Sequence, residues 1–398
     1  DDEPHPLMVF ALSLFGSYVY LVLACLLVDF VDLCKGVVPL LKAPRHGRAP
    51  WHEFFKLGAR PRVLQVKAAA VLVVYALLLG TALARSYAAP HVQRVEVFLD
   101  RLPSCMDGYR LLLIADVHAG PLVGRAEIAR LVEQANQIQA DAVLLGGDFV
   151  DGATARIGTI VAPFQNLTAP GGVFYILGNH EYLHGGVGSE WLARFAQLGA
   201  TTLLNEHRAL GRSASCAGVD LLGVDDLSKN ASVAAAMLGR DQDRAAVLLA
   251  HQPSVSRQAV PLNVDLQISG HTHGGQIWPL HALLYLTNTY FAGLSREGNT
   301  WIYVSNGAFG WGPRMRMGSR NEIDVIVLRA ARAADAPALG PAPSVVWAWA
   351  SYPFIALTVL VGTLVFARSH LRRRDSPAPP GPEPEPEDAH LDEILSEL

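Results

Sequence analysis

The chain of 398 residues is 51% hydrophobic and only 17% charged, with a formal net charge of −4. Soluble domains carry about 25% charged residues, so this composition indicates membrane-spanning segments. The charge balance provides no concentrated basic face, and we expect no nucleic-acid partner. The four cysteines include no CxxC spacing, which excludes a zinc finger. Because the chain begins with Asp1 rather than Met, we expect a fragment of a longer protein.

Three apolar runs are long enough to cross a lipid bilayer. The first covers 7–31 and carries no charge before Asp29, and the second covers 68–84, near the lower length limit for a span. The third covers 344–367 and has aromatic residues near one end, as at a membrane interface. For the second run, cleavage of a signal peptide at 82–84 is the alternative, and we favour a retained span.

These runs divide the chain into five parts. They are two transmembrane helices with a basic loop (1–89), a soluble α/β domain (90–330), a linker (331–343), a transmembrane helix (344–367), and a basic then acidic disordered tail (368–398). Basic residues crowd the first loop and the start of the tail, so the positive-inside rule puts both in the cytoplasm. We therefore expect an integral membrane protein whose α/β domain is extracytoplasmic or lumenal. Cys105 and Cys216 could pair there if that compartment is oxidising.

Five short motifs each follow an apolar, strand-like run. They are DVH with Asp116 and His118, GDFVD with Asp148 and Asp151, GNHE with Asn179 and His180, AHQP with His251, and GHTHGGQ with His271 and His273. Alternate residues leaving a strand point the same way, so the two histidines of the last motif face one spot. Each motif alone fits an ordinary polar strand end. Five in succession predict a metal site at the carboxyl ends of the strands, where open α/β sheets build their sites.

In this order the five motifs resemble the calcineurin-like metallophosphoesterase superfamily, over about 92–328. GVDD, SGHTHGGQIWPL and PRMRMGSRNEI are similar to the transmembrane metallophosphoesterases of animals and to their membrane-anchored bacterial relatives. The resemblance implies an α/β fold in which two mixed β-sheets are sandwiched and flanked by helices, with the transmembrane helices added. It makes 90–330 the metallophosphoesterase domain.

The resemblance also implies two divalent metal ions bridged by Asp148, with a hydroxide held between them as the nucleophile. The implied ligands are Asp116, His118 and His273 for one ion, and Asn179, His251 and His271 for the other. Mixed imidazole and carboxylate ligation fits manganese, iron or zinc and does not choose among them.

Four further residues have expected roles around these ions. The resemblance implies that His180 protonates the leaving oxygen or stabilises its developing charge. Glu181 is expected to orient His180, and Asp151 to support the loop of Asp148. Arg314 and Arg316, in PRMRMGSR, could clamp a phosphate, with structural strand-surface charges as the alternative.

The function that follows is hydrolysis of phosphomonoester, phosphodiester or diphosphate bonds by a membrane-anchored, metal-dependent enzyme. The anchor favours a lipid-linked phosphorylated substrate. The alternative is a catalytically silent membrane receptor or scaffold that retains the fold. Loss of a ligand at position 148 or 251 would mark such a protein, and the sequence keeps Asp148 and His251.

Overall fold

The structure is a computed structural model that describes residues 6–42, 61–213, 215–279 and 288–331. The transmembrane helix expected at 344–367, the tail 368–398, the linker beyond residue 331 and the central part of the basic loop lie outside the described residues.

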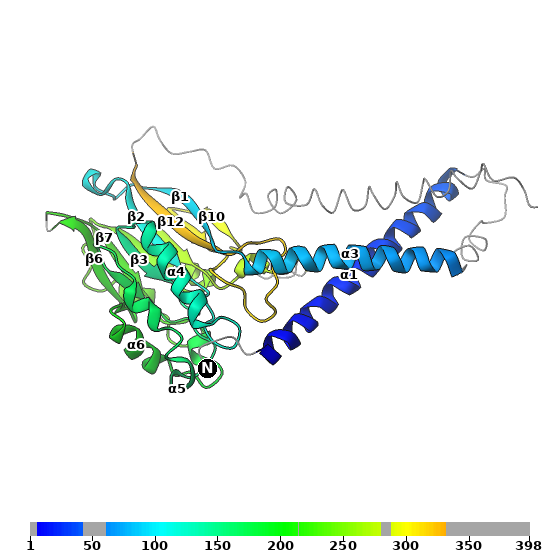
Figure 1. Ribbon diagram of the computed structural model, residues 1–398. Helices are drawn as coiled ribbons and strands as arrows, with labels where there is room; N and C mark the ends of the chain where they lie inside the picture. The colour runs from blue at the N-terminus through cyan, green and yellow to red at the C-terminus, as the bar shows by residue number, and fades with distance from the viewer. Residues whose placement is uncertain (1–5, 43–60, 214, 280–287, 332–398) are drawn as a thin grey trace, which may run out of the picture. The chain divides into compact units, whose positions relative to one another are not determined.

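Two long helices, coloured blue in Figure 1, form the N-terminal part: α1 (Pro6–Lys42) and α3 (Pro61–Tyr87). Each contains a 27-residue stretch that is long and apolar enough to cross a membrane. The stretches expected to span, 7–31 and 68–84, fall within these helices. The helices pack together through small and apolar side chains, among them Ala24 and Ala82.

The α/β part is built on two six-stranded mixed sheets (Figure 1). The first contains, in spatial order, β1 (His91–Leu99), β12 (Glu322–Ala330), β2 (Tyr109–Ile114), β3 (Ala142–Leu145), β4 (Val173–Tyr175) and β5 (Thr201–Thr202). The second contains β10 (Gly293–Glu297), β11 (Thr300–Val304), β9 (Leu266–Ser269), β8 (Ala245–Leu249), β7 (Cys216–Gly223) and β6 (Glu206–Ser213). Strands β2 to β5 pair in parallel, as do β7, β8, β9 and β11, so the carboxyl ends within each set meet at one edge.

Alternating apolar residues assign the two faces of each sheet to different cores. In β2, Leu111 and Leu113 face the core between the sheets, whereas Leu112 and Ile114 face an outer core. That outer core is covered by the amphipathic helices α4 (Arg125–Gln137) and α6 (Gly188–Gln197). A smaller outer core lies under α7 (Val233–Ala236) and α8 (Ser256–Ala259) on the second sheet. The expected sandwich of two mixed sheets flanked by helices is confirmed.

Short helices occupy several of the connections. They are η1 (Ser104–Met106), α5 (Thr154–Ile157), η2 (Ala162–Asn166), η3 (His180–Tyr182), η4 (Pro253–Val255) and η5 (His273–Gly275). Cys105 in η1 forms a disulfide with Cys216 at the start of β7, the pairing that the sequence left open. The bond joins η1, which connects β1 and β2 of the first sheet, to β7 of the second sheet.

Candidate metal centre

The predicted ligands gather at one edge of the sandwich because each follows the carboxyl end of a parallel strand. Asp116 follows β2, Asp148 follows β3, Asn179 follows β4, His251 follows β8, and His271 follows β9. Their ligand atoms form two compact groups: Asp116 with His118 and His273, and Asp148 with His251 and His271. The structure thus brings together residues up to 157 positions apart in the sequence, from Asp116 to His273.

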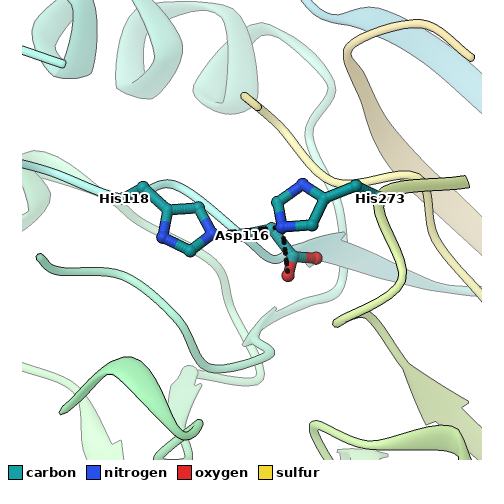
Figure 2. Close-up of side chains that lie close together, drawn as sticks. All are labelled: Asp116, His118 and His273. Carbon is teal, nitrogen blue, oxygen red and sulfur yellow. Dashed lines mark hydrogen bonds and ion pairs between the residues drawn. The ribbon is translucent and has the colours of Figure 1, made fainter. Parts of the chain in front are cut away.

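In the first group, two imidazole nitrogens face each other. His118 Nε2 and His273 Nε2 are 3.2 Å apart, and His273 Nε2 is 3.6 Å from Asp116 Oδ1. Figure 2 shows both rings beside the Asp116 carboxylate, with a dashed line that joins the carboxylate to His273. The other nitrogen of each ring has an oxygen acceptor, Asp151 Oδ1 at 3.0 Å from His118 Nδ1 and Phe309 O at 3.2 Å from His273 Nδ1. With Nδ1 donating in both rings and both rings neutral, the two Nε2 atoms present lone pairs to one point, as metal-binding histidines do.

The second group repeats this arrangement. His251 Nε2 lies 3.0 Å from Asp148 Oδ2 and 3.2 Å from His271 Nδ1, while His251 Nδ1 donates to the carbonyl of Gly146 at 3.0 Å. Asn179 Oδ1 is buried and has no hydrogen-bond partner among the described residues. A buried carbonyl oxygen without a donor is costly, and a cation would satisfy it. Both groups therefore fit divalent metal ions.

Asp148 is electrostatically tied to both groups. Burial by itself would raise the pKa of its carboxyl, but His251, His118 and His180 hold it well below its usual range. The carboxylate therefore stays ionised at neutral pH. An ionised, buried carboxylate that interacts electrostatically with imidazoles of both groups is the kind of ligand that can offset the repulsion between two cations.

The histidines divide into two protonation classes when no metal is bound. Burial would lower the pKa of His118 and His251, but Asp151 beside the first and Asp148 beside the second outweigh it, raising their pKa values to about 9 and about 10. Burial and the neighbouring His251 lower the pKa of His271 to about 4. Metal binding at His118 and His251 would therefore have to displace protons.

The backbone at this edge adopts a sparsely populated conformation. The φ angles of Asp116, His118, Asp148, His271 and His273 are 56°, 52°, 53°, 72° and 53°. Non-glycine residues rarely adopt positive φ, and clusters of them mark functional sites. Gly270 and Gly178 allow the close approach, because a Cβ at either position would collide with a carboxylate oxygen of Asp116 or Asp148.

Asp151 and Glu181 support the cluster, but in roles opposite to those expected. The Asp151 carboxylate accepts from Nδ1 of His180 at 2.6 Å and from Nδ1 of His118 at 3.0 Å. Asp151 therefore orients His180, the role expected of Glu181. The three residues also form a compact group of potential ligands, yet these distances describe hydrogen bonds that leave each Nε2 available.

Glu181 holds the loop of Asp148. Its buried carboxylate accepts from the backbone N–H groups of Asp148 at 3.1 Å, Phe149 at 2.7 Å and Gly178 at 2.6 Å. Burial and then Asp148 raise the pKa of this carboxyl to about 7. Glu181 thus fixes the ends of β3 and β4 against each other, and the expectation that it contacts His180 is wrong in its choice of partner.

His180 lies beside the cluster, close to Asp148. Its backbone N–H donates to Asp148 Oδ1 at 2.8 Å, and its ring Nε2 is 3.9 Å from Asp148 Oδ2. The ring of Trp311 lies edge-on to it, with 5.5 Å between centroids. An imidazole held at Nδ1 by Asp151 is positioned to exchange a proton at Nε2.

Arg314 and Arg316 of PRMRMGSR both form hydrogen bonds or ion pairs with other parts of the protein. Arg316 is fully buried and donates to the carbonyl oxygens of His273, Asn306 and Phe309. Arg314 pairs with Glu127 at 2.7 Å and stacks on Tyr87, 4.3 Å from the ring centroid. These contacts favour a structural role over phosphate binding. For Arg316 that role is to hold the loops that carry His273.

Sequence reasoning assigned no role to Gln276 and Trp311. The Gln276 side chain pairs with the backbone of Trp311, accepting from its N–H at 2.9 Å and donating to its carbonyl at 2.8 Å. The signal for Gln276 was its place in GHTHGGQ. Trp311 lies outside every motif and could be found only from its contacts.

Comparisons with known proteins identify relatives of this chain. The family model of calcineurin-like phosphoesterases matches residues 109–275. The transmembrane protein with metallophosphoesterase domain of Bos taurus is 34% identical over 83% of this chain and 76% of its own length. An uncharacterised metallophosphoesterase of Helicobacter pylori is 36% identical over 59% of this chain and 63% of its own length.

Among solved structures, a dimetal phosphatase from Danio rerio aligns over 50% of this chain and 88% of its own, with 12% identity and a TM-score of 0.34. The similarity to the Bos taurus protein extends well beyond the family model and covers most of both chains. This chain belongs to the calcineurin-like phosphoesterase family.

Proposed function

We propose that the chain is a membrane-anchored phosphoesterase that uses two divalent ions, manganese, iron or zinc, to hydrolyse phosphoester or diphosphate bonds. Asp116, His118 and His273 would hold one ion, Asn179, His251 and His271 the other, and Asp148 both. When bound, such ions supply Lewis-acid activation of the phosphoryl group and of the attacking water. The assignment is supported by family membership and by the two compact groups of ligand atoms.

One observation carries the proposal furthest. His118 Nε2 and His273 Nε2 lie 3.2 Å apart, while the Nδ1 atoms of both rings have oxygen acceptors. Two lone pairs at this distance repel each other unless a cation or a proton lies between them. Metal–nitrogen bonds are about 2.1 Å long, so one ion can bind both nitrogens.

The chain's own groups would then handle the proton of the leaving alcohol. His180 is oriented by Asp151 through Nδ1, which leaves Nε2 to donate to the leaving oxygen as the bond to phosphorus breaks. Asp151 holds the ring in place for that transfer. Glu181 keeps the Asp148 loop in place and does not take part in proton transfer.

The proposed topology puts the catalytic domain outside the cytoplasm. The basic loop between the two described helices supports a cytoplasmic position for that loop. The disulfide between Cys105 and Cys216 supports an oxidising compartment for the domain. The lipid bilayer is accordingly a permanent partner of the chain.

Turnover of a p-nitrophenyl phosphomonoester and of the corresponding diester by the purified full chain, with manganese supplied, tests the proposal. Hydrolysis of at least one substrate that is abolished by a chelator and restored by metal is the expected result. A metal-loaded chain that hydrolyses neither would favour the silent receptor or scaffold instead.

A further inference from the structure

The metal centre lies at the edge of the first sheet where the membrane helix α3 enters. Strand β1 begins at His91, four residues after α3 ends at Tyr87. His91 is paired with Glu322 of β12, and Asp324 of β12 is paired in turn with Leu113 of the antiparallel β2. The start of β1 is therefore level with the residue before Asp116. The edge of the first sheet that carries the proposed ligands is therefore the edge at which the chain arrives from helix α3.

The loop between β11 and β12 joins this edge to the helices. Arg316 N donates to the carbonyl of Ala82 at 2.9 Å, and Asn321 Nδ2 donates to the carbonyls of Ser86 and Ala88 at 2.8 and 3.0 Å. Asn321 thus caps the carboxyl end of α3, whose last carbonyls need donors. Met315 is fully buried in the cluster formed with both helices.

The same loop presents an exposed indole beside the reacting groups. The side chain of Trp311 is 50% exposed, and its ring lies 5.5 Å from that of His180. The Gln276 amide fixes the backbone of Trp311 from both sides, and Gln276 itself has a φ of 42°. An exposed tryptophan whose backbone is held beside a reacting group is typical of a binding contact, because its large apolar face loses little entropy on binding.

We infer that the substrate is a phosphoester whose leaving group is an apolar alcohol taken from the bilayer, and that Trp311 contacts this leaving group beside His180. The inference rests on the proposed function and on membrane anchorage by α1 and α3. His180 protonates the leaving oxygen in that function, so a group adjacent to His180 lies on the leaving-group side of the phosphorus. The loop contacts to α3 put that side next to the membrane surface, where tryptophan is enriched.

Two alkyl phosphates test the contact with Trp311 separately from proton transfer by His180. Ethyl phosphate and dodecyl phosphate release primary alcohols of similar acidity, so the demand on His180 is the same and only the apolar contact differs. The assay uses the full chain in lipid vesicles, with manganese supplied, and measures the ratio of kcat/KM for dodecyl phosphate to kcat/KM for ethyl phosphate. We expect this ratio to be about 10- to 100-fold lower in Trp311→Ala than in the wild type. That range corresponds to the free energy of burying one large apolar side chain. Because the wild type and the variant are assayed in the same lipid, the partitioning of dodecyl phosphate into the bilayer affects both equally and cancels in the comparison.

Three comparisons make the experiment decisive. Trp311→Phe should retain most of the ratio, and Leu238→Ala, which truncates a side chain that is 75% exposed two residues after α7, should leave it unchanged. Diluting the total lipid at constant mole fraction of dodecyl phosphate should leave the rate unchanged, since the substrate is taken from the bilayer. A rate that follows the bulk concentration would refute the membrane source.

Equal loss on both substrates in Trp311→Ala, or no loss on either, would overturn the role of Trp311. Failure of the wild-type chain to hydrolyse these two monoesters and the p-nitrophenyl esters as well would count against the proposed function by itself. Binding of dodecylphosphonate against ethylphosphonate, measured by calorimetry, would still decide the inference in that case. The expected result is tighter binding of the long-chain phosphonate that Trp311→Ala abolishes.

Discussion

Asp151 Oδ1 lies 2.6 Å from His180 Nδ1, and the same oxygen accepts a hydrogen bond from His118 Nδ1 at 3.0 Å. One carboxylate therefore orients a proposed metal ligand and the proposed leaving-group acid. The substitution Asp151→Asn keeps the shape and removes the charge. We expect it to lower turnover by about 10- to 100-fold, the usual cost of losing an oriented imidazole. Steady-state rates measure this, with the exposed Asp243→Asn as a control. Unchanged turnover would show that Asp151 does not orient His180.

His180 is expected to act on the leaving oxygen and to leave the metals in place. His180→Gln should keep the metal content and the thermal midpoint, because the His180 ring is outside the two proposed ligand sets. Its turnover should fall by roughly 10²- to 10⁴-fold on an alkyl ester. The loss should be smaller on a p-nitrophenyl ester, whose leaving group hardly needs protonation. Equal losses on both esters, or loss of a metal, would contradict this role.

The sequence predicted that these residues gather at one edge because each follows an apolar strand, and parallel strands bring their carboxyl ends together. It predicted the partners of Asp151 and Glu181 poorly. The GDFVD motif shows that a carboxylate lies near Asp148, but whether it faces the imidazole of His180 or the backbone of its own loop depends on how β3 and β4 pack. Local spacing does not contain that information.

Arg316 illustrates the same limit more strongly. As a charge in a loop it suggests phosphate binding, whereas its guanidinium is fully buried among backbone carbonyls of its own loop and of the loop that carries His273. Those carbonyls come from segments up to 43 positions away, including that of His273. Only the assembled fold reveals such a partner set. The apolar run before DVH, by contrast, predicted the strand β2 from local sequence alone.

A buried acid away from the cluster should make stability depend on pH. Burial and then Glu322 raise the pKa of Asp324 well above its usual value, and its Oδ1 accepts from the Tyr303 hydroxyl at 2.8 Å. The folded state therefore favours the protonated acid. That stabilisation is fully present below the unfolded pKa of about 4 and is lost as pH rises toward the folded pKa.

Asp324→Asn imitates the protonated acid and removes this loss. The variant should gain stability relative to the wild type between pH 5 and 8, by up to about 1.4 kcal/mol per pH unit. Thermal midpoints of both proteins, measured in chelator so that metal loading does not vary with pH, check the difference. A difference that does not change with pH would show that Asp324 is ionised in the folded state.

The proposed orientation predicts a protease pattern. In sealed vesicles whose outer face is the cytoplasmic one, the metallophosphoesterase domain should be protected. The basic loop between Lys35 and Lys67 and the C-terminal tail should be cut, because their basic flanks put them in the cytoplasm. Immunoblots against the tail and the domain, with detergent-opened vesicles as the control, measure both. A digested domain and a protected tail would reverse the topology.

The central claim is that Asp148 belongs to two metal sites at once, and metal analysis of the purified chain tests it most directly. The wild type should carry about two divalent ions per chain. Asp148→Asn removes the charge that offsets their repulsion, so the occupancy of both sites should fall, and the thermal midpoint should fall with it. One ion in the wild type, or loss of a single ion in Asp148→Asn with the other fully retained, would contradict a shared ligand.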